Sequence, residues 1–312
     1  MILVVNLNLT VDRIMEVDIL VPGVVHRATR TDLQAGGKGV NVIRTLKTLG
    51  LSCRLLGIVA GRTGDYIDSR LEQEGIDRIL VTAKGDSRTS VILLETNPAH
   101  PGNSQTVINE NGPVIDETSV EETISLFAQC VIQCDLVVLT GSVPPGFHSD
   151  IYKRLIELAN QARKQTILDA AGEPLRLGIS AGPTIVKPNQ YEAGILCDCS
   201  ISSGEQGLSV AQKMLGMGVE IAATTLGKDG MVVARKNEAY RITPPIIEAK
   251  NAVGSGDAAA AGFAAGCLRG LSLADTAKLA VACGTASARH GFGRSSRKEI
   301  EEIRKQVIVG KL

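Results

Sequence analysis

Short apolar runs alternate with longer amphipathic segments along most of this chain. Residues 2–7 and 53–60 are nearly continuous apolar runs, whereas residues 40–49 and 64–74 carry apolar side chains at helical spacing. Continuous apolar runs of this length are typical of strands buried on both faces, and the amphipathic segments are typical of helices. Strands that alternate with helices in this way predict a mainly parallel sheet covered by helices.

The same alternation continues toward the C-terminal end of the chain. Further strands are expected at residues 76–81, 136–139, 166–169, 185–186 and 221–225, with a hairpin at residues 231–242. Further helices are expected at residues 117–133, 151–164, 203–216, 273–290 and 297–306. No internal repeat interrupts the pattern, and no linker is long enough to separate two folding domains.

Two insertions, at residues 12–33 and 87–113, depart from this rhythm. The first alternates loosely around the Pro22-Gly23 turn and predicts two strands, with Arg27 on the second. The second predicts a hairpin of residues 90–95 and 105–108 around a turn at residues 98–103. We therefore expect two strand-forming insertions in one body made of residues 1–11, 34–86 and 114–312.

Composition narrows the class of protein. Hydrophobic residues make up 44% of the 312 residues, enough for a full core, and 33 basic residues balance 33 acidic ones. A zero net charge argues against a nucleic-acid partner or an anionic membrane, although it leaves room for a local basic pocket. No apolar stretch reaches the roughly 18 residues that span a bilayer, and the N-terminus lacks the basic segment of a signal peptide. We expect a cytoplasmic protein.

The seven cysteines give no sign of a disulfide framework or a zinc site. They stand at positions 53, 130, 134, 197, 199, 267 and 283, an odd number without a Cys-x-x-Cys pair. The four histidines are not spaced as co-ligands. We therefore expect most of the cysteines to be buried thiols.

Residues 250–265, KNAVGSGDAAAAGFAA, are the stretch that points most directly to chemistry. Gly254 and Gly256 allow a tight turn with positive φ, and the alanine-rich run is a strong helix former, so Asp257 is expected at the start of a helix. A helix N-terminus offers unpaired N–H groups and partial positive charge, which suit a phosphate or a phosphoryl group in transfer. The alternative is an ordinary first-turn aspartate without a ligand.

This stretch resembles the C-terminal signature of the ribokinase/PfkB family of sugar kinases. Residues 35–42, AGGKGVNV, resemble the family's other signature near the N-terminus, although a lone glycine cluster before a helix is more often a tight turn. The resemblance covers nearly the whole chain and implies a ribokinase-like three-layer α/β/α body with a small β-sheet lid. It also implies that Asp257 deprotonates a sugar hydroxyl, while amides of Gly254, Ser255 and Gly256 contribute to an anion hole.

The resemblance implies a sugar site between the lid and the body. Asp12 matches an aspartate that hydrogen-bonds sugar hydroxyls, and Arg88 matches a position that holds the substrate phosphate in phosphohexose kinases of the family. Taken alone, Asp12 could be a solvated turn residue and Arg88 a charged residue that protects a strand edge. The implied substrate-binding residues are Asp12, Arg27, Gly37, Lys38, Asn41, Arg88, Ser142 and Asp257.

The resemblance also implies ATP and Mg²⁺ as cofactors. Asn189 and Glu192 would share one face of a helix that begins after Pro188, and the family's Asn-x-x-Glu pair helps to hold magnesium. Such a small protein ligand set is chemically sufficient, because Mg²⁺ keeps several waters. The implied cofactor-binding residues are Lys187, Asn189, Thr225, Gly227, Gly230, Gly254 and Gly256.

Within the family, the sequence is most similar to the branch that holds 1-phosphofructokinase and tagatose-6-phosphate kinase. This similarity implies phosphorylation of a ketohexose monophosphate, either fructose 1-phosphate to fructose 1,6-bisphosphate or tagatose 6-phosphate. Ala252 and Ile43 depart from the usual pattern and loosen the assignment to one branch. A kinase of an unphosphorylated sugar or nucleoside and an inactive sugar-binding regulator remain as alternatives. The apolar face of the lid predicts a homodimer through the lid.

Overall fold

Two sheets contain the strands of the computed structural model, which describes residues 1–97, 105–201 and 204–312. The larger sheet has the order β14-β13-β12-β11-β10-β9-β8-β1-β4-β5. Neighbouring strands from β11 to β5 are parallel, and β12, β13 and β14 extend the sheet in antiparallel pairs. Its strands are β1 (Ile2–Asn6), β4 (Cys53–Ala60), β5 (Arg78–Ala83), β8 (Leu136–Thr140), β9 (Gln165–Asp169), β10 (Ile185–Val186), β11 (Ile221–Thr225), β12 (Met231–Arg235), β13 (Glu238–Thr243) and β14 (Ile308–Lys311).

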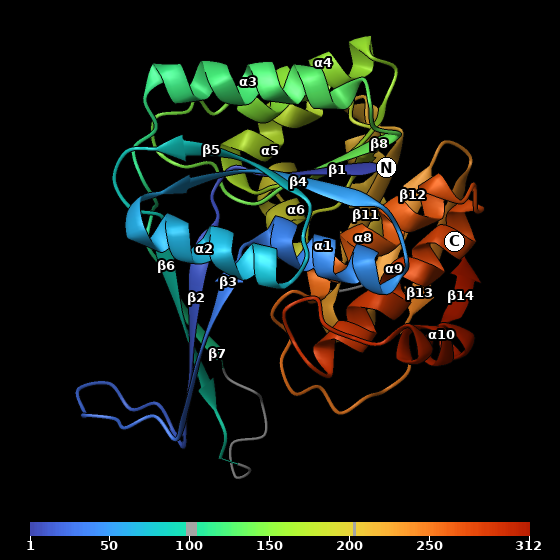
Figure 1. Cartoon of the computed structure of the whole chain (residues 1–312). Helices are drawn as coiled ribbons and strands as arrows, with labels where there is room; N and C mark the ends of the chain where they lie inside the picture. The colour runs from blue at the N-terminus through green and yellow to red at the C-terminus, as the bar shows by residue number, and fades with distance from the viewer. Residues whose placement is uncertain (98–104, 202–203) are drawn as a thin grey trace.

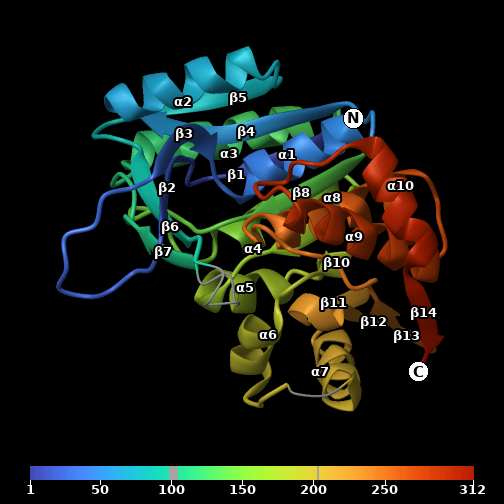
Figure 2. The same ribbon diagram turned by 90° about the horizontal axis from the view of Figure 1, so that it is seen from below.

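Helices cover both faces of this sheet (Figures 1 and 2). Strand β1 shows the reason, because Ile2 and Val4 belong to one buried core cluster whereas Leu3 and Val5 belong to the other. One core is closed by α1 (Lys38–Thr48), α2 (Gly61–Gln73), α8 (Ser255–Leu268), α9 (Leu273–Ala288) and α10 (Arg297–Gln306). The other is closed by α3 (Glu117–Val131), α4 (Ile151–Gln161), α5 (Gly172–Ile179), α6 (Gln190–Cys197) and α7 (Gly204–Gly216). The alternation of strands and helices therefore produces three layers, as the sequence predicts.

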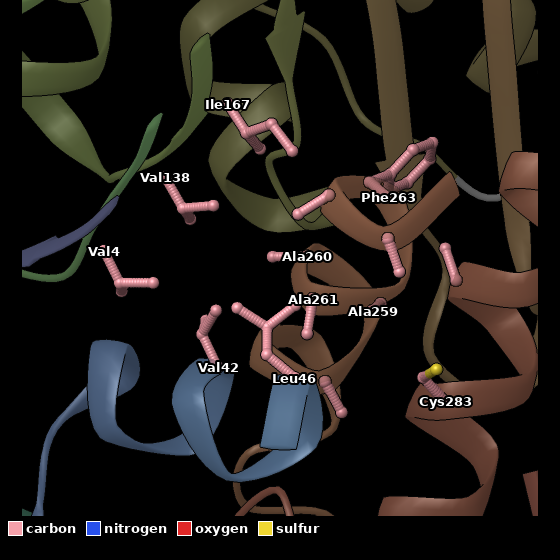
Figure 3. Packing of buried hydrophobic residues seen from close by; sticks show 14 of the residues in the cluster. Val4, Val42, Leu46, Val138, Ile167, Ala259, Ala260, Ala261, Phe263 and Cys283 are labelled. Carbon is pink, nitrogen blue, oxygen red and sulfur yellow. The ribbon is translucent and has the colours of Figure 1, made fainter. Parts of the chain in front are cut away.

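Helix α8 is buried on all sides rather than on one face. Ala260 and Ala261 are fully buried and lie between α1 and residues of the sheet such as Val138 (Figure 3). A Cβ at Gly262 would come within 2.5 Å of the Cα of Ala280, so the absence of a side chain lets α8 and α9 approach closely. The small residues that follow Asp257 thus fix the start of α8 in the middle of the molecule.

The smaller sheet, which we call the lid, extends away from the body (Figure 1). Its order is β3-β2-β6-β7, with β2 (Thr10–Val17), β3 (Arg30–Gly36), β6 (Arg88–Glu95) and β7 (Gln105–Asn109). The pairs β2–β3 and β6–β7 are antiparallel, as their sequences predict, and β2 joins β6 in parallel. All five residues of β7 are exposed, so this strand is an open edge of the sheet.

One expectation is wrong, and two elements were not predicted. Arg27 lies in the exposed connection between β2 and β3 and not on a strand, because the pairing of β2 ends at Arg30 and leaves Val24 and Val25 58% and 87% exposed. The sequence analysis assigns no element to residues 172–179, where the structure has α5 with Pro174 in its first turn, a position at which proline is tolerated. Strand β14 is missed because its four exposed residues carry no clear alternation. The turn expected at residues 98–103 lies outside the described residues.

The cysteines and the membrane-spanning potential of the helices can also be compared with the sequence analysis. Five of the seven free cysteines are buried, whereas Cys199 and Cys267 are partly exposed, which agrees with the expectation of mostly buried thiols. In the described parts of the chain, no helix has both the length and the apolar character that crossing a membrane requires.

Candidate active site

A cleft of about 1640 Å³ opens where the carboxyl ends of the parallel strands face the lid. Ligand sites of open α/β sheets typically form at this edge, because the loops after parallel strands converge there. Asp169 from the end of β9 and Lys187 after β10 line its floor, and Arg88 from the lid lines one wall. The start of α8, including Asp257, lies between these parts. The two sequence signatures and the lid therefore meet in one cleft.

The start of α8 is shaped by Gly254. This residue is the N-cap, has a φ of 83°, and would place a Cβ only 2.7 Å from the backbone nitrogen of Gly293. No larger residue fits that conformation without displacing the neighbouring chain. The Ser255 amide donates to the Ala252 carbonyl, so the open N–H groups of this first turn are those of Gly256 and Asp257. An anion at this position would meet two amides and the positive end of the helix.

Asp257 stands at this helix start as a buried carboxylate, 6% exposed. Its Oδ2 accepts a hydrogen bond of 2.9 Å from Nδ2 of Asn41, so the glycine-rich motif and the Gly-Ser-Gly-Asp motif are in direct contact. Burial raises the pKa of Asp257 to about 6, while Lys38, the hydrogen bond from Asn41 and Lys187 act in the opposite direction. A carboxylate with this pKa is suited to accept a proton near neutral pH.

Two lysines converge on a second buried carboxylate, Asp169. Lys38 Nζ lies 3.2 Å from its Oδ1, and Lys187 Nζ lies 3.1 Å from its Oδ2. Burial opposes the ionisation of Asp169, but Lys187 and Lys38 outweigh burial and hold its pKa below the ordinary value. Lys187 is buried, whereas 38% of the Lys38 side chain is exposed toward the cleft. The cleft floor thus carries two fixed ammonium groups next to the start of α8.

Asp12 and Arg88 form the lid side of the site. Asp12 is 4% exposed, and burial raises its pKa to about 7 although Arg44 and Arg88 lower it. A Cβ at Gly36 would lie 2.0 Å from Asp12 Oδ2, so the glycine at this position allows the carboxylate to lie against the backbone. Arg88 donates from Nε to the Asn8 carbonyl at 3.3 Å, and burial lowers its pKa against the attraction of Asp12. Asp12 is therefore a buried residue of the cleft lining and not a solvated turn residue.

Asn189 and Glu192 line the cleft, but their side chains hydrogen-bond to the backbone of α6, whereas the sequence analysis expects them to help hold magnesium. They form a capping box at the start of α6, in which Asn189 Oδ1 accepts from the amide of Glu192 and Glu192 Oε2 accepts from the amide of Asn189. The Asn189 oxygen is therefore already engaged. Glu192 Oε1 lies 4.0 Å from Lys38 Nζ and is the oxygen of this pair that faces other cleft groups.

A divalent metal fits this donor set in one way. The described residues contain no cluster of three or more His, Cys, Asp or Glu side chains that could hold a metal by themselves. Mg²⁺ does not need such a cluster, because it usually keeps several waters and shares one or two carboxylates with substrate phosphates. A single carboxylate, Glu192, in a cleft that also contains two lysines and an open helix N-terminus fits that pattern.

The structure brings most of the predicted site residues to the cleft lining. They are Asp12, Gly37, Lys38, Asn41, Arg88, Ser142, Lys187, Asn189, Glu192, Thr225, Gly227, Gly230, Gly254, Ser255, Gly256 and Asp257. Arg27 does not line the cleft within this chain, since it lies in the exposed connection of the lid.

Sequence reasoning missed Asp169 and two asparagines of the cleft. Asn6 Oδ1 accepts from the Gly39 amide at 2.8 Å, and Asn8 Nδ2 donates to Ser142 Oγ at 3.1 Å, so both fix loops of the site. A signal was present, because Asn6 and Asp169 are polar residues at the ends of buried parallel strands, where binding residues are typically found.

Comparisons with known proteins agree with this geometry. The pattern of the pfkB family carbohydrate kinases matches residues 1–299. A 1-phosphofructokinase of Bacillus subtilis (strain 168) is 32% identical to this chain over 288 residues, which are 92% of each protein. The solved structure of a candidate phosphofructokinase from Staphylococcus aureus is 30% identical, with a TM-score of 0.82 over 100% of this chain and 99% of that one.

A ribokinase from Thermotoga maritima shares the fold. Its structure has a TM-score of 0.76 and 21% identity and covers 97% of this chain and 99% of its own. The expected ribokinase-like α/β body with a separate small sheet is therefore confirmed, as is the family resemblance drawn from residues 35–42 and 250–265.

Proposed function

This chain belongs to the pfkB family of carbohydrate kinases, and we propose that it transfers the terminal phosphoryl group of ATP to a hydroxyl of a ketohexose monophosphate. The observation that carries the proposal is the position of Asp257. This buried carboxylate has a raised pKa and stands at the open N-terminus of α8, with Lys38 and Lys187 close to the same cleft floor. Such a site offers a base beside a binding place for an anion.

In this proposal, Asp257 accepts the proton of the attacking sugar hydroxyl. The amides of Gly256 and Asp257 donate to the oxygens of the transferred phosphoryl group, whose charge the first turn of α8 also stabilises. Lys187 adds a fixed positive charge close to this turn. Its Nζ would lie 3.7 Å from a Cβ built on Gly256. Glu192 would hold Mg²⁺ through water, and the bound ion would neutralise charge on the ATP phosphates.

The nucleotide would occupy the end of the cleft formed by the turn after β11. Gly227 and Gly230 line that end, and a Cβ at Gly230 would lie 2.0 Å from the Ile242 carbonyl oxygen. The glycine therefore keeps the turn against the following hairpin, where Thr225 also pairs with Asn189. This pairing places the turn beside the start of α6 and hence beside the proposed magnesium ligand Glu192.

The substrate phosphate would bind between Arg88 of the lid and Lys38 of the body. Arginine and lysine are the usual partners of a phosphate group, and Arg88 is partly buried in the cleft wall. A neutral sugar would offer no anion to Arg88, whose Nε donates to the uncharged Asn8 carbonyl in a partly desolvated site. We therefore favour fructose 1-phosphate as substrate, with tagatose 6-phosphate as the alternative.

The lid would also form the contact of a homodimer. Ile108 on the open edge strand β7 is 59% exposed and pairs with Val91 of β6, on the face opposite to Val107, which lines the cleft. A small sheet with an uncovered apolar face is rarely stable by itself. A second lid would cover this face. Sedimentation velocity at micromolar concentration should give twice the mass of 32.8 kDa, and a monomer would contradict the dimer.

The substrate proposal is tested by ADP release with fructose 1-phosphate, fructose 6-phosphate, tagatose 6-phosphate and free fructose. We expect Arg88→Ala and Lys38→Ala each to lower kcat/KM for the phosphorylated sugars by roughly 10- to 100-fold, since each removes a charge-assisted hydrogen bond. Arg13→Ala is the matched control, because Arg13 is an exposed lid arginine on β2 that does not line the cleft. Equal wild-type turnover of free fructose would contradict the proposed substrate. Turnover of a nucleoside would favour a kinase of an unphosphorylated substrate, and binding without ADP release would favour an inactive sugar-binding regulator.

A further inference from the structure

Arg44 is a buried cation that the proposed mechanism does not use. It lies on α1, three residues after Asn41, and is 8% exposed. Burying a guanidinium costs free energy unless its donors are paired. The groups to which Arg44 donates therefore indicate its role in the structure. Because α1 also packs against the core with Val42, Ile43 and Leu46, an apolar residue would be the ordinary choice at this position.

Every part of the Arg44 guanidinium has an acceptor. Nε and Nη2 donate to the two carboxylate oxygens of Glu74 at 2.8 and 2.7 Å, and Nη2 also donates to the Ala35 carbonyl at 2.8 Å. Nη1 donates to Oδ1 of Asn41 at 3.2 Å. Glu74 is the residue at the C-terminal cap of α2, so the paired carboxylate holds the guanidinium plane in one orientation.

This arrangement fixes the orientation of the Asn41 amide. A guanidinium has donors and no acceptor, so the Asn41 group that faces it must be the oxygen. The amide nitrogen then points the other way, toward Asp257, where Nδ2 donates to Oδ2 at 2.9 Å. If the amide were turned over, its NH₂ group would face the Arg44 donors and its oxygen would face the buried carboxylate.

We infer that Arg44, held in place by Glu74, is a positioning residue that orients the Asn41 amide and thereby holds the carboxylate of Asp257 in place for proton transfer. The inference rests on the proposed function, because it assigns Arg44 a part in the reaction at Asp257. One carboxylate oxygen is held by Asn41, which leaves the other for the substrate hydroxyl. The chain of contacts starts at the end of α2 and ends at the start of α8.

Other charged groups also act on Asp257 and must stay unchanged in a test. They are Lys38 of α1, Asp169 of β9, Lys187 after β10 and, from the lid, Asp12. Arg44 contributes positive charge near Asp12 and lowers the pKa of that carboxyl. A useful variant therefore keeps the charge at position 44 and removes only the planar fork, as Arg44→Lys does.

The experiment compares Arg44→Lys, Glu74→Gln and Lys47→Met in the full-length protein. Lys47 is the matched control, because it lies on the same helix and donates to the carbonyls of Glu74 and Gly75 but reaches no cleft residue. For Arg44→Lys we expect kcat to fall by roughly 10- to 100-fold, as for small displacements of a reacting group or loss of a supporting contact. KM for the sugar phosphate should change little, since Arg88 and Lys38 remain.

A second readout separates positioning from a merely structural role. When the Asn41 amide is free to turn, Asp257 loses a hydrogen bond to its charged form, so its pKa and the acidic limb of the kcat/KM profile should move to higher pH. Titration of ¹³C-labelled aspartate side chains by NMR measures the same pKa without turnover, with Asp257→Asn identifying the signal. Lys47→Met should leave kcat and this titration unchanged, even if it lowers the melting temperature.

The outcomes are distinct. A lower kcat and a raised Asp257 pKa in Arg44→Lys, with smaller effects of the same sign in Glu74→Gln and none in Lys47→Met, support the inference. A folded Arg44→Lys variant with wild-type kcat and titration overturns it, as does an equal loss of kcat in Lys47→Met. If the wild type turns over none of the sugar phosphates, the proposed substrate fails, and the NMR titration alone still decides whether Arg44 orients Asn41 toward Asp257.

Discussion

The cleft floor contains two buried carboxylates, Asp169 and Asp257, whose pKa values differ although both side chains are almost fully buried. Asp169 and Asp257 are 2% and 6% exposed. Asp169 is contacted by two ammonium groups within 3.2 Å, whereas Asp257 accepts a hydrogen bond from the neutral Asn41 amide. The pKa of Asp169 lies below its ordinary value and that of Asp257 is raised to about 6. Burial raises the pKa of both acids, so the difference between the two pKa values comes from their partners.

In the proposed reaction, this difference would give the two carboxylates separate tasks. Asp169 stays ionised and holds Lys38 and Lys187 in place, so the floor of the cleft keeps a fixed pair of cations. Asp257 can take up and release a proton near neutral pH, because its charged form is less well compensated. The two aspartates also act on each other, since the charge of Asp169 raises the pKa of Asp257.

The sharpest test of this comparison is Asp257→Asn. Asparagine has nearly the same shape but cannot accept the hydroxyl proton, so kcat should fall by ~10² to 10⁴, the usual contribution of a general base. The fold should persist, because the substitution removes a buried charge whose folded pKa is raised. Circular dichroism and ADP release measure the two effects. A folded variant with more than about a tenth of wild-type kcat would show that Asp257 is not the base.

The pH profile gives the same test without a mutation. Asp257 must be ionised to accept a proton, so kcat/KM of the wild type should rise as the pH increases through about 6. Asp12, whose pKa is raised to about 7, is coupled to Asp257 and broadens this limb upward. A limb centred near the ordinary aspartate value of 3.8 would contradict the raised pKa.

The contrast between these carboxylates also shows how far the sequence can be interpreted. The position of Asp257 at a helix start follows from Gly254, Gly256 and the alanines behind them, which are local signals. The role of Asp169 depends on Lys38, 131 positions away in the chain, and on Lys187 from another strand end. No local pattern encodes that meeting, although the end of a buried parallel strand marks a place to look.

The same distinction explains the errors in the fold. The layers and the lid pairing follow from apolar runs and turn residues, which are local and repeated along the chain. Arg27 was expected on a strand because the alternation around it is loose but present, and only the partner strand decides where pairing ends. Asn189 and Glu192 have helical spacing, yet that spacing also suits a capping box, and the structure shows this local use.

A smaller effect is expected for Asp169→Asn, which should lower the free energy of unfolding. Asp169→Asn leaves Lys187, 3% exposed, without its counter-charge, and breaking a fully buried ion pair typically costs about 3 to 5 kcal/mol. Lys38 contributes less to this loss, because more than a third of its side chain is exposed to solvent. Urea denaturation at pH 7 should therefore show a lower free energy of unfolding for the variant.

The double variant Asp169→Asn/Lys187→Met separates the ion pair from the packing around it. Removing both charges avoids a buried unpaired ammonium, so the double variant should regain part of the lost stability while activity stays low. The sign of the pH dependence gives a second check. Because the folded pKa of Asp169 is lowered, its contribution is present above the ordinary value of 3.8 and is lost as the pH falls through the folded value, so wild type and Asp169→Asn should converge in acid. Equal stabilities at pH 7, or a difference that grows in acid, would show that the lysines do not hold Asp169 in its charged form.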